Sequence, residues 1–208
     1  MLNMKNNNTQ LASVDLSAYV LGLARWVEQF IKLGFEPYIA TFMFRSLPSS
    51  EPTAKQIMRD EVTRVYGRFL TEAVRNPWSS NNATNRPVLI GCADWPVYKG
   101  RTRGQHKMNG SGIHFGSVLL VPPRNRLTRG VKEHFEEHRR AAYVRPDHAL
   151  QRIDIEHVED DFERVVAYTF KSLLNRRCTV DDVVLLPHSR SERDSLAYSA
   201  ARPATPPP

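Results

Sequence analysis

The sequence predicts an α+β fold: an antiparallel sheet with helices on one face. Two observations support this. Short apolar segments typical of strands alternate with amphipathic segments of helical period, and the two middle strand segments follow each other with no helical segment between them. Consecutive strands of this kind pair antiparallel, because a parallel pair needs a long crossover. A chain of 208 residues, 41% of them hydrophobic, suits one folded domain.

The first half contains two helices and a strand. Apolar residues recur at helical spacing over 16–31, and Gly34 follows as a stop, which predicts a leading helix. Residues 37–47 are apolar and rich in aromatic and β-branched side chains, which predicts a buried strand. Residues 50–75 return to the helical period, with Pro52 where a first helical turn accepts it.

The second half supplies the remaining elements. Residues 87–98 and 111–121 are predicted strands that form a hairpin, and 128–143 is a charged helix with a threonine cap. Residues 150–157 alternate as a strand does, and 160–176 form a helix with acids at its start and bases at its end. The order βαββαβα after a leading helix favours a ferredoxin-like (RRM-like) arrangement.

The ends of the chain differ from this domain, which we expect to cover 14–187. Residues 1–13 are polar and 188–208 are rich in Ser, Arg and Pro, so both are predicted to be disordered. No apolar run approaches the ~18 to 20 residues of a membrane span, and the N-terminus has no signal-peptide core. Cys92 and Cys178 form neither a disulfide framework nor a metal-binding pair by spacing. These features predict a cytoplasmic protein with no membrane partner.

Positive charge is concentrated in the middle of the chain. Residues 77–150 hold 12 basic and 5 acidic residues, and 97–107 contain four bases and no acid. Such a segment favours contact with nucleic-acid phosphates, although a solvated loop of a basic protein has the same composition. The candidate nucleic-acid-binding residues are Lys99, Arg101, Arg103, Lys107, Arg124 and Arg126.

Two polar residues interrupt the apolar strands of the hairpin. His114 shares a strand face with Gly116, whose missing side chain leaves room for another group to approach. Asp94 lies on the preceding strand, where a carboxylate is costly unless a cation or a hydrogen bond answers it. The two residues could be neighbours across the hairpin and serve as metal ligands, with His106 as a third. The alternatives are a half-buried histidine with a satisfied hydrogen bond, and an ion pair between Asp94 and an arginine.

Tyr168 and Lys171 are three residues apart on the last predicted helix, so both project from nearly the same face. A phenol is a weak nucleophile until a nearby ammonium group or metal favours its phenolate. The pair can therefore make a nucleophile and its helper. A core tyrosine beside a surface lysine is the structural alternative.

In this order, these segments resemble the HUH-type single-strand endonucleases, which include the Rep-like initiators of rolling-circle replication. Residues 39–44 resemble the apolar, threonine-containing strand that opens the nuclease domain, and 113–120 resemble its metal-binding strand. Residues 168–171 resemble its tyrosine helix with the Tyr-x-x-Lys pattern, so the likeness spans about residues 37–175. The family's second metal-binding histidine is replaced here by Gly116.

The resemblance implies that Tyr168 attacks a phosphate of single-stranded DNA, giving a 5′-phosphotyrosyl link and a free 3′-hydroxyl, with Lys171 assisting. It also implies Mg²⁺ or Mn²⁺ bound through His114, with Asp94 or His106 in place of the lost ligand. The expected partners are an origin hairpin in single-stranded DNA and a host helicase.

Other functions fit the same residues. A non-catalytic nucleic-acid-binding module is the main alternative, motivated by Gly116, and an assembly or regulatory protein with an acidic partner is a third. RNA-recognition domains use exposed aromatics on their central strands, and Phe42, Phe44 and Phe115 have suitable positions. Core packing explains these aromatics more simply, because their strands are strongly apolar.

Overall fold

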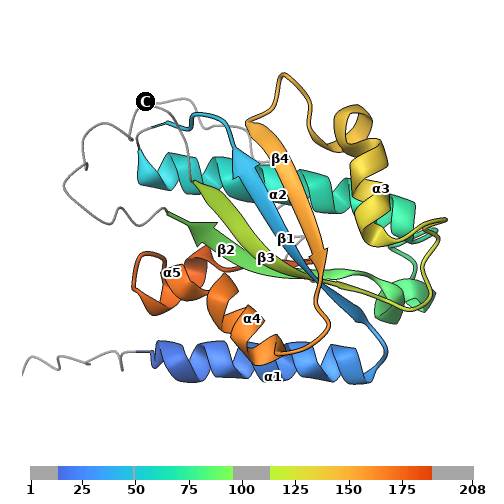
Figure 1. The fold of residues 1–208 in the computed structure, drawn as a ribbon, viewed down its shortest axis with the longest axis horizontal. Coiled ribbons are helices and arrows are strands. Elements are labelled where there is room, and N and C mark those ends of the chain that lie inside the picture. Colours follow the sequence, from blue (N-terminus) through green and yellow to red (C-terminus); the bar gives the residue numbers. More distant parts are fainter. Residues whose placement is uncertain (1–13, 49, 96–112, 189–208) are drawn as a thin grey trace, which may run out of the picture.

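The computed structural model describes residues 14–48, 50–95 and 113–188 (Figure 1). The predicted N-terminal extension and nearly all of the C-terminal tail lie outside these residues, as does most of the basic connection between the hairpin strands. The helices are α1 (Leu16–Lys32), α2 (Glu51–Ala73), α3 (Val131–His138), α4 (Phe162–Thr169) and α5 (Lys171–Leu174). The strands are β1 (Glu36–Phe44), β2 (Val88–Asp94), β3 (His114–Val121), β4 (Leu150–His157) and β5 (Val184–Leu186). Short 3₁₀ helices at Ser80–Asn85 and Val180–Asp182 and a π-helical turn at Arg139–Tyr143 complete the described elements.

One open sheet has the strand order β4-β1-β3-β2-β5, and every neighbouring pair is antiparallel. The predicted hairpin is confirmed: Val88 lies opposite Leu120, and Asp94 lies opposite His114. The α+β class is confirmed as well, and the arrangement is consistent with a ferredoxin-like fold. The sequence analysis did not predict β5, which has three residues and too little pattern to recognise.

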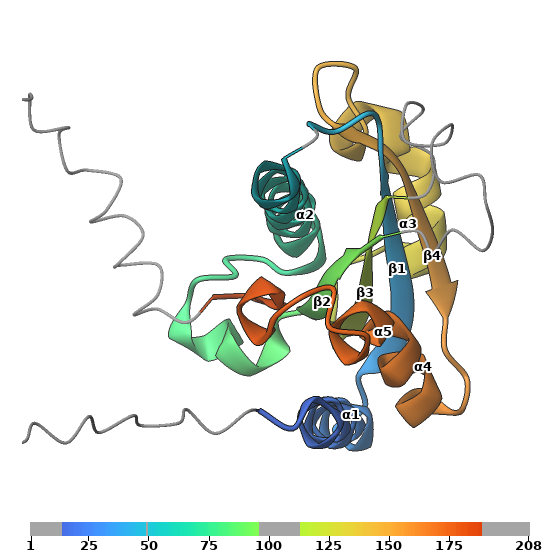
Figure 2. The same cartoon turned by 90° about the vertical axis from the view of Figure 1, so that its left-hand side faces the viewer.

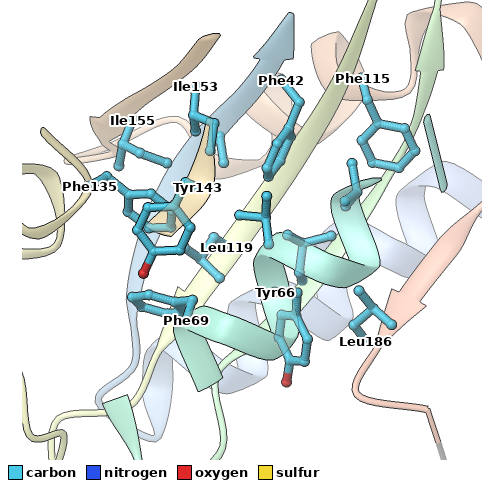
Figure 3. Packing of buried hydrophobic residues seen from close by; sticks show 14 of the residues in the cluster. Phe42, Tyr66, Phe69, Phe115, Leu119, Phe135, Tyr143, Ile153, Ile155 and Leu186 are labelled. Atoms are coloured by element: carbon cyan, nitrogen blue, oxygen red, sulfur yellow. The ribbon is translucent and has the colours of Figure 1, made fainter. Parts of the chain in front are cut away.

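Helices cover both faces of the sheet. On one face, α2 and α3 pack on aromatic residues that include Phe42, Phe115 and Tyr143 (Figure 3). On the other face, Ile90 and Cys92 meet α1, α4 and α5. Figure 1 shows α1 alongside α4 below the strands, and α2 behind them. Figure 2 shows the same sheet turned by 90°.

The prediction that the helices share one face is therefore correct for α2 and α3 and wrong for the other three. The physical reason lies in β2 and β3, which are apolar on both faces. Val118, Leu119, Leu120 and Val121 are all buried, although successive side chains of a strand point to opposite faces. A continuous apolar run of this kind requires cover on both sides of the sheet.

The aromatic residues of the sheet belong to the core. Phe42, Phe44 and Phe115 are 1%, 2% and 2% exposed. Core packing, the simpler interpretation of these residues, is confirmed, and none of the three is available for base stacking.

The last predicted helix is divided in two. Phe170 leaves the helical conformation with ψ 19°, so α4 ends at Thr169 and α5 begins at Lys171. Phe170 is fully buried between the sheet and α1, which places the following turn against the end of β2. Within the described ranges, none of the helices combines the length and the apolar character needed to span a membrane.

Candidate functional site

The candidate site is built around Asp94, the last residue of β2, which is 3% exposed. Its Oδ2 atom accepts hydrogen bonds from His114 Nε2 at 3.0 Å and from Lys171 Nζ at 2.8 Å. Its Oδ1 atom accepts a short hydrogen bond from the hydroxyl group of Ser172. The predicted proximity of Asp94 and His114 is confirmed. The partners of the buried Asp94 carboxylate are thus His114 and Lys171 rather than an arginine.

These contacts determine the charges in the site. Burial alone would raise the pKa of Asp94, but hydrogen bonds from His114, Lys171 and Ser172 outweigh it and hold this pKa well below its usual range. Burial opposes the charge of Lys171, yet the bond to Asp94 raises the pKa of that ammonium group overall. Asp94 is therefore an anion and Lys171 a cation at neutral pH. An ionised carboxylate only accepts hydrogen bonds, so Nε2 of His114 carries the proton that points at it.

Tyr168 lies on the solvent side of this network. Its side chain is 62% exposed, and Nζ of Lys171 lies 4.2 Å from the centroid of its ring. Lys171 is the more enclosed of the two, with a side chain 32% exposed. The alternative of a core tyrosine beside a surface lysine is therefore wrong, because Tyr168 is the more exposed residue and Lys171 the more buried one.

Four predicted residues thus come together from separate elements: Asp94 from β2, His114 from β3, Tyr168 from α4 and Lys171 from α5. The sequence analysis missed Ser172. A small polar residue inside a helical pattern carries no signal of its own, and Ser172 meets Asp94 on α5, after the break at Phe170.

Gly116 lies on the same strand face as His114, below α4. A β-carbon added at Gly116 would lie 3.7 Å from the carbonyl oxygen of Thr169 and 3.9 Å from its methyl carbon, which is ordinary contact. Across the sheet, Gly116 lies opposite Thr41, which in turn lies opposite Asp154. A β-carbon is therefore sterically tolerated where the resemblance expects the second histidine.

The described residues do not by themselves make a divalent-metal site. No cluster of three His, Cys, Asp or Glu side chains with metal-binding geometry occurs among them, and His106 lies outside them. Both oxygens of Asp94 are already engaged, and Lys171 takes the cation position beside this carboxylate. His114 and Asp94 therefore face each other as hydrogen-bond partners. Mg²⁺ or Mn²⁺ at His114 stays a prediction from the resemblance, and we derive no step through a metal.

The candidate nucleic-acid-binding residues do not all lie near this site. Lys99, Arg101, Arg103 and Lys107 lie outside the described residues. Arg124 and Arg126 follow β3, whereas His114 begins it, so these two arginines lie at the opposite end of the strand. Tyr168 belongs to the other end, because it contacts Lys171, which binds Asp94 opposite His114.

A small cavity of about 280 Å³ adjoins the exposed tyrosine. Its lining residues are Ile39, Asp160, Asp161, Arg164, Val165 and Tyr168. Ile39 and Val165 provide an apolar surface, while two carboxylates and one guanidinium group provide polar ones.

The arrangement therefore combines an exposed phenol, an adjacent ammonium group and an imidazole, with a buried carboxylate that holds the last two in place. Such a set can bind a phosphate and attack it. Comparison of the chain with protein-family models, with curated proteins and with solved structures finds no match.

Proposed function

We propose that this protein nicks single-stranded DNA through Tyr168, in the manner of the HUH-type endonucleases it resembles. The observation that carries the proposal is the position of Lys171, which contacts the exposed ring of Tyr168 and is held by the buried carboxylate of Asp94. The order β4-β1-β3-β2, with α2 and α3 on one face, supports a ferredoxin-like (RRM-like) nuclease core. In this proposal, α1, α4 and α5 are the layer that brings the nucleophile to the sheet.

The reaction is an in-line displacement at phosphorus. The phenolic oxygen of the exposed Tyr168 loses its proton to the surrounding water and forms a bond to the phosphorus atom. The bond from phosphorus to the 3′ oxygen breaks, and this oxygen takes up a proton as a free 3′-hydroxyl group. The 5′ side of the break stays attached to Tyr168 as a phosphodiester. No bond energy is lost to water, so the same steps in reverse rejoin the strand.

The remaining residues have distinct roles. Lys171 places a positive charge beside Tyr168, where it favours the phenolate and the negative charge that grows on the phosphate oxygens. The His114 side chain is 24% exposed and binds the same carboxylate oxygen of Asp94 as Lys171 does. Asp94 is a positioning residue, because it is buried and orients both neighbours without reaching the substrate.

The test uses single-stranded oligonucleotides that tile the DNA around the gene, labelled at either end and incubated with Mn²⁺ or with EDTA. A denaturing gel should show the 3′-labelled fragment bound to protein and the 5′-labelled fragment released. The Tyr168→Phe variant should form no adduct, whereas Tyr19→Phe, a control on α1, should match the wild type. The absence of any adduct from folded wild-type protein on every oligonucleotide would refute the proposal. The Mn²⁺ and EDTA arms decide whether the predicted metal takes part.

A second candidate function is DNA binding without cleavage. The observation that favours it is Gly116, which supplies no ligand where the related enzymes carry one. It predicts salt-sensitive binding that neither EDTA nor Tyr168→Phe changes. A metal-independent adduct would count against it, because covalent capture shows chemistry. The origin hairpin and the host helicase stay predictions that belong to the nicking proposal.

A further inference from the structure

A basic cleft lies at the end of the sheet remote from Tyr168. Its volume is about 570 Å³, and it is formed where the end of α2, the 3₁₀ helix Ser80–Asn85 and the segment after β3 meet. The residues that matter here are Arg75, Arg124, Arg126, Asn76, Asn82 and Asn85. We call this feature the arginine cleft.

Hydrogen bonds join the segments that carry the arginines. The side-chain amide of Asn82 donates to the carbonyl oxygens of Arg75 and Asn76, at 2.7 and 3.2 Å. The amide of Asn85 donates to the carbonyl oxygen of Arg124 at 2.6 Å. The backbone N–H of Arg126 donates to the carbonyl oxygen of Ala73 at 2.9 Å. The backbone around the cleft is therefore organised before any ligand arrives.

Among the described residues, nothing compensates the charge of the arginine cleft. Arg75, Arg124 and Arg126 are exposed, and the described residues that line the cleft include no acid. Within the described part of the chain, no carboxylate lies within 4.0 Å of their guanidinium groups, whereas Arg68, Arg129 and Arg145 each have one. Three unpaired guanidinium groups around one hollow produce a local positive potential that suits an anion.

We propose that the arginine cleft binds backbone phosphates of DNA, as a second contact on the molecule that Tyr168 cuts. The choice of DNA rests on the proposed function. Guanidinium groups bind phosphate oxygens in pairs and stay charged at every physiological pH, so they fix the course of a strand without reading its bases.

The length of β3 sets the spacing between the two contacts. Seven residue steps of about 3.3 Å place the cleft about 23 Å or more from His114 along the strand. Only single-stranded DNA that extends well beyond the scissile phosphate reaches the arginine cleft from Tyr168, whose partner Lys171 binds Asp94 at the His114 end of β3.

The experiment compares two triple variants that remove the same charge. The cleft variant is Arg75→Gln, Arg124→Gln and Arg126→Gln, and the control is Arg68→Gln, Arg129→Gln and Arg145→Gln, whose arginines are ion-paired. Both are made in the Tyr168→Phe background, so that binding is measured without cleavage. Each is tested for binding to a short single-stranded oligonucleotide from the DNA around the gene, and to the same oligonucleotide extended by about fifteen nucleotides on each side, at several salt concentrations. Thermal unfolding checks that both triple variants fold.

We expect the cleft variant to lose about tenfold or more in affinity for the extended DNA and to lower the salt slope by about 2 to 3, with little change for short DNA. The control variant should lose much less. Equal losses in the two variants would overturn the proposal, because net charge alone would then explain them. Saturable binding of inorganic phosphate at constant ionic strength, lost in the cleft variant and without any effect of DNA length, would also overturn it in favour of a small-anion site. Nicking without a cleft effect refutes this inference alone, whereas a cleft effect without nicking refutes only the proposed function.

Discussion

The ammonium group of Lys171 lies 2.8 Å from the carboxylate of Asp94, and these two residues are 77 positions apart in the sequence. The ion pair joins the end of β2 to the start of α5 and brings the lysine against the ring of Tyr168. Because Asp94 is buried, the partner that neutralises it has little freedom to move away. The geometry thus ties the stability of this corner of the fold to the position of the proposed catalytic cation.

Replacing Lys171 with Met should affect both activity and stability. The loss of the charge beside Tyr168 should slow adduct formation by about 100-fold or more. Removing one partner of the buried Asp94 should lower the free energy of unfolding by about 1 to 3 kcal/mol. Single-turnover gels and urea titration measure the two effects. The control is Lys32→Met, which breaks an exposed ion pair with Glu28 and should cost less than about 0.5 kcal/mol. Equal effects of the two substitutions would contradict the proposed role of Lys171.

The lowered pKa of Asp94 predicts that the free energy of unfolding depends on pH in the acid range. Its pKa is lowered in the folded protein, so the unfolded chain binds a proton more readily than the folded one. The stabilisation is complete above the ordinary aspartate pKa of about 3.9 and is lost as pH falls below it. Asp94→Asn should therefore destabilise the protein most above pH 4, and the gap to the wild type should narrow at lower pH. Urea titrations from pH 2.5 to 7 test this, and a constant gap would contradict it.

The buried His134 predicts that the stability of the protein also depends on pH near neutrality. This residue on α3 is buried, its Nε2 atom lies 2.7 Å from the hydroxyl group of Tyr143, and its ring stacks on His138. Burial, aided by the nearby His138, lowers the pKa of His134 in the folded protein.

The folded protein therefore resists protonation of His134. Its stability should be complete above the ordinary histidine pKa of about 6.5 and should fall as pH drops below this value. His134→Gln should reduce the loss of melting temperature between pH 7 and pH 5. The control is His157→Gln, which replaces an exposed histidine on β4. If the two variants melt with the same pH dependence, His134 is not the responsible group.

Two glycines of neighbouring strands should respond differently to alanine. A β-carbon at Gly91 would collide with the carbonyl oxygen of Gly116 and would lie 2.6 Å from the β-carbon of Ser117. Gly91→Ala should therefore cost about 1 to 3 kcal/mol or more, since backbone cannot move aside cheaply. Gly116→Ala meets only ordinary contacts and should stay within about 0.5 kcal/mol of the wild type. Chemical denaturation of both variants measures the difference, and similar costs would show that β2 and β3 are spaced otherwise.

Several features of the site could be predicted from the sequence because they are local. The hairpin follows from two consecutive strands, and the pairing of Asp94 with His114 follows from their positions on either side of the segment that connects these strands. Tyr168 and Lys171 are only three residues apart in the sequence, so they stay close although the helix breaks between them. These relationships involve consecutive segments of the chain, whose patterns a short stretch of sequence displays.

Other features depended on contacts between distant segments. Ser172 on α5 binds Asp94 at the end of β2, a contact between residues 78 positions apart in the sequence. The arginine cleft forms because Arg75, which follows α2, lies near Arg124, which follows β3. These residues are far apart in the sequence, and no local pattern predicts that they come together.

The sequence by itself determined the α+β class, the order of the main elements and four residues of the candidate site, since hydrophobic period and residue chemistry are properties of short segments. Only the tertiary structure decided which faces of the sheet are covered, which cation forms an ion pair with Asp94 and which arginines line a common cleft. Those outcomes depend on how segments that are distant along the chain bury their apolar surfaces against one another, and the alternatives differ by packing rather than by local pattern.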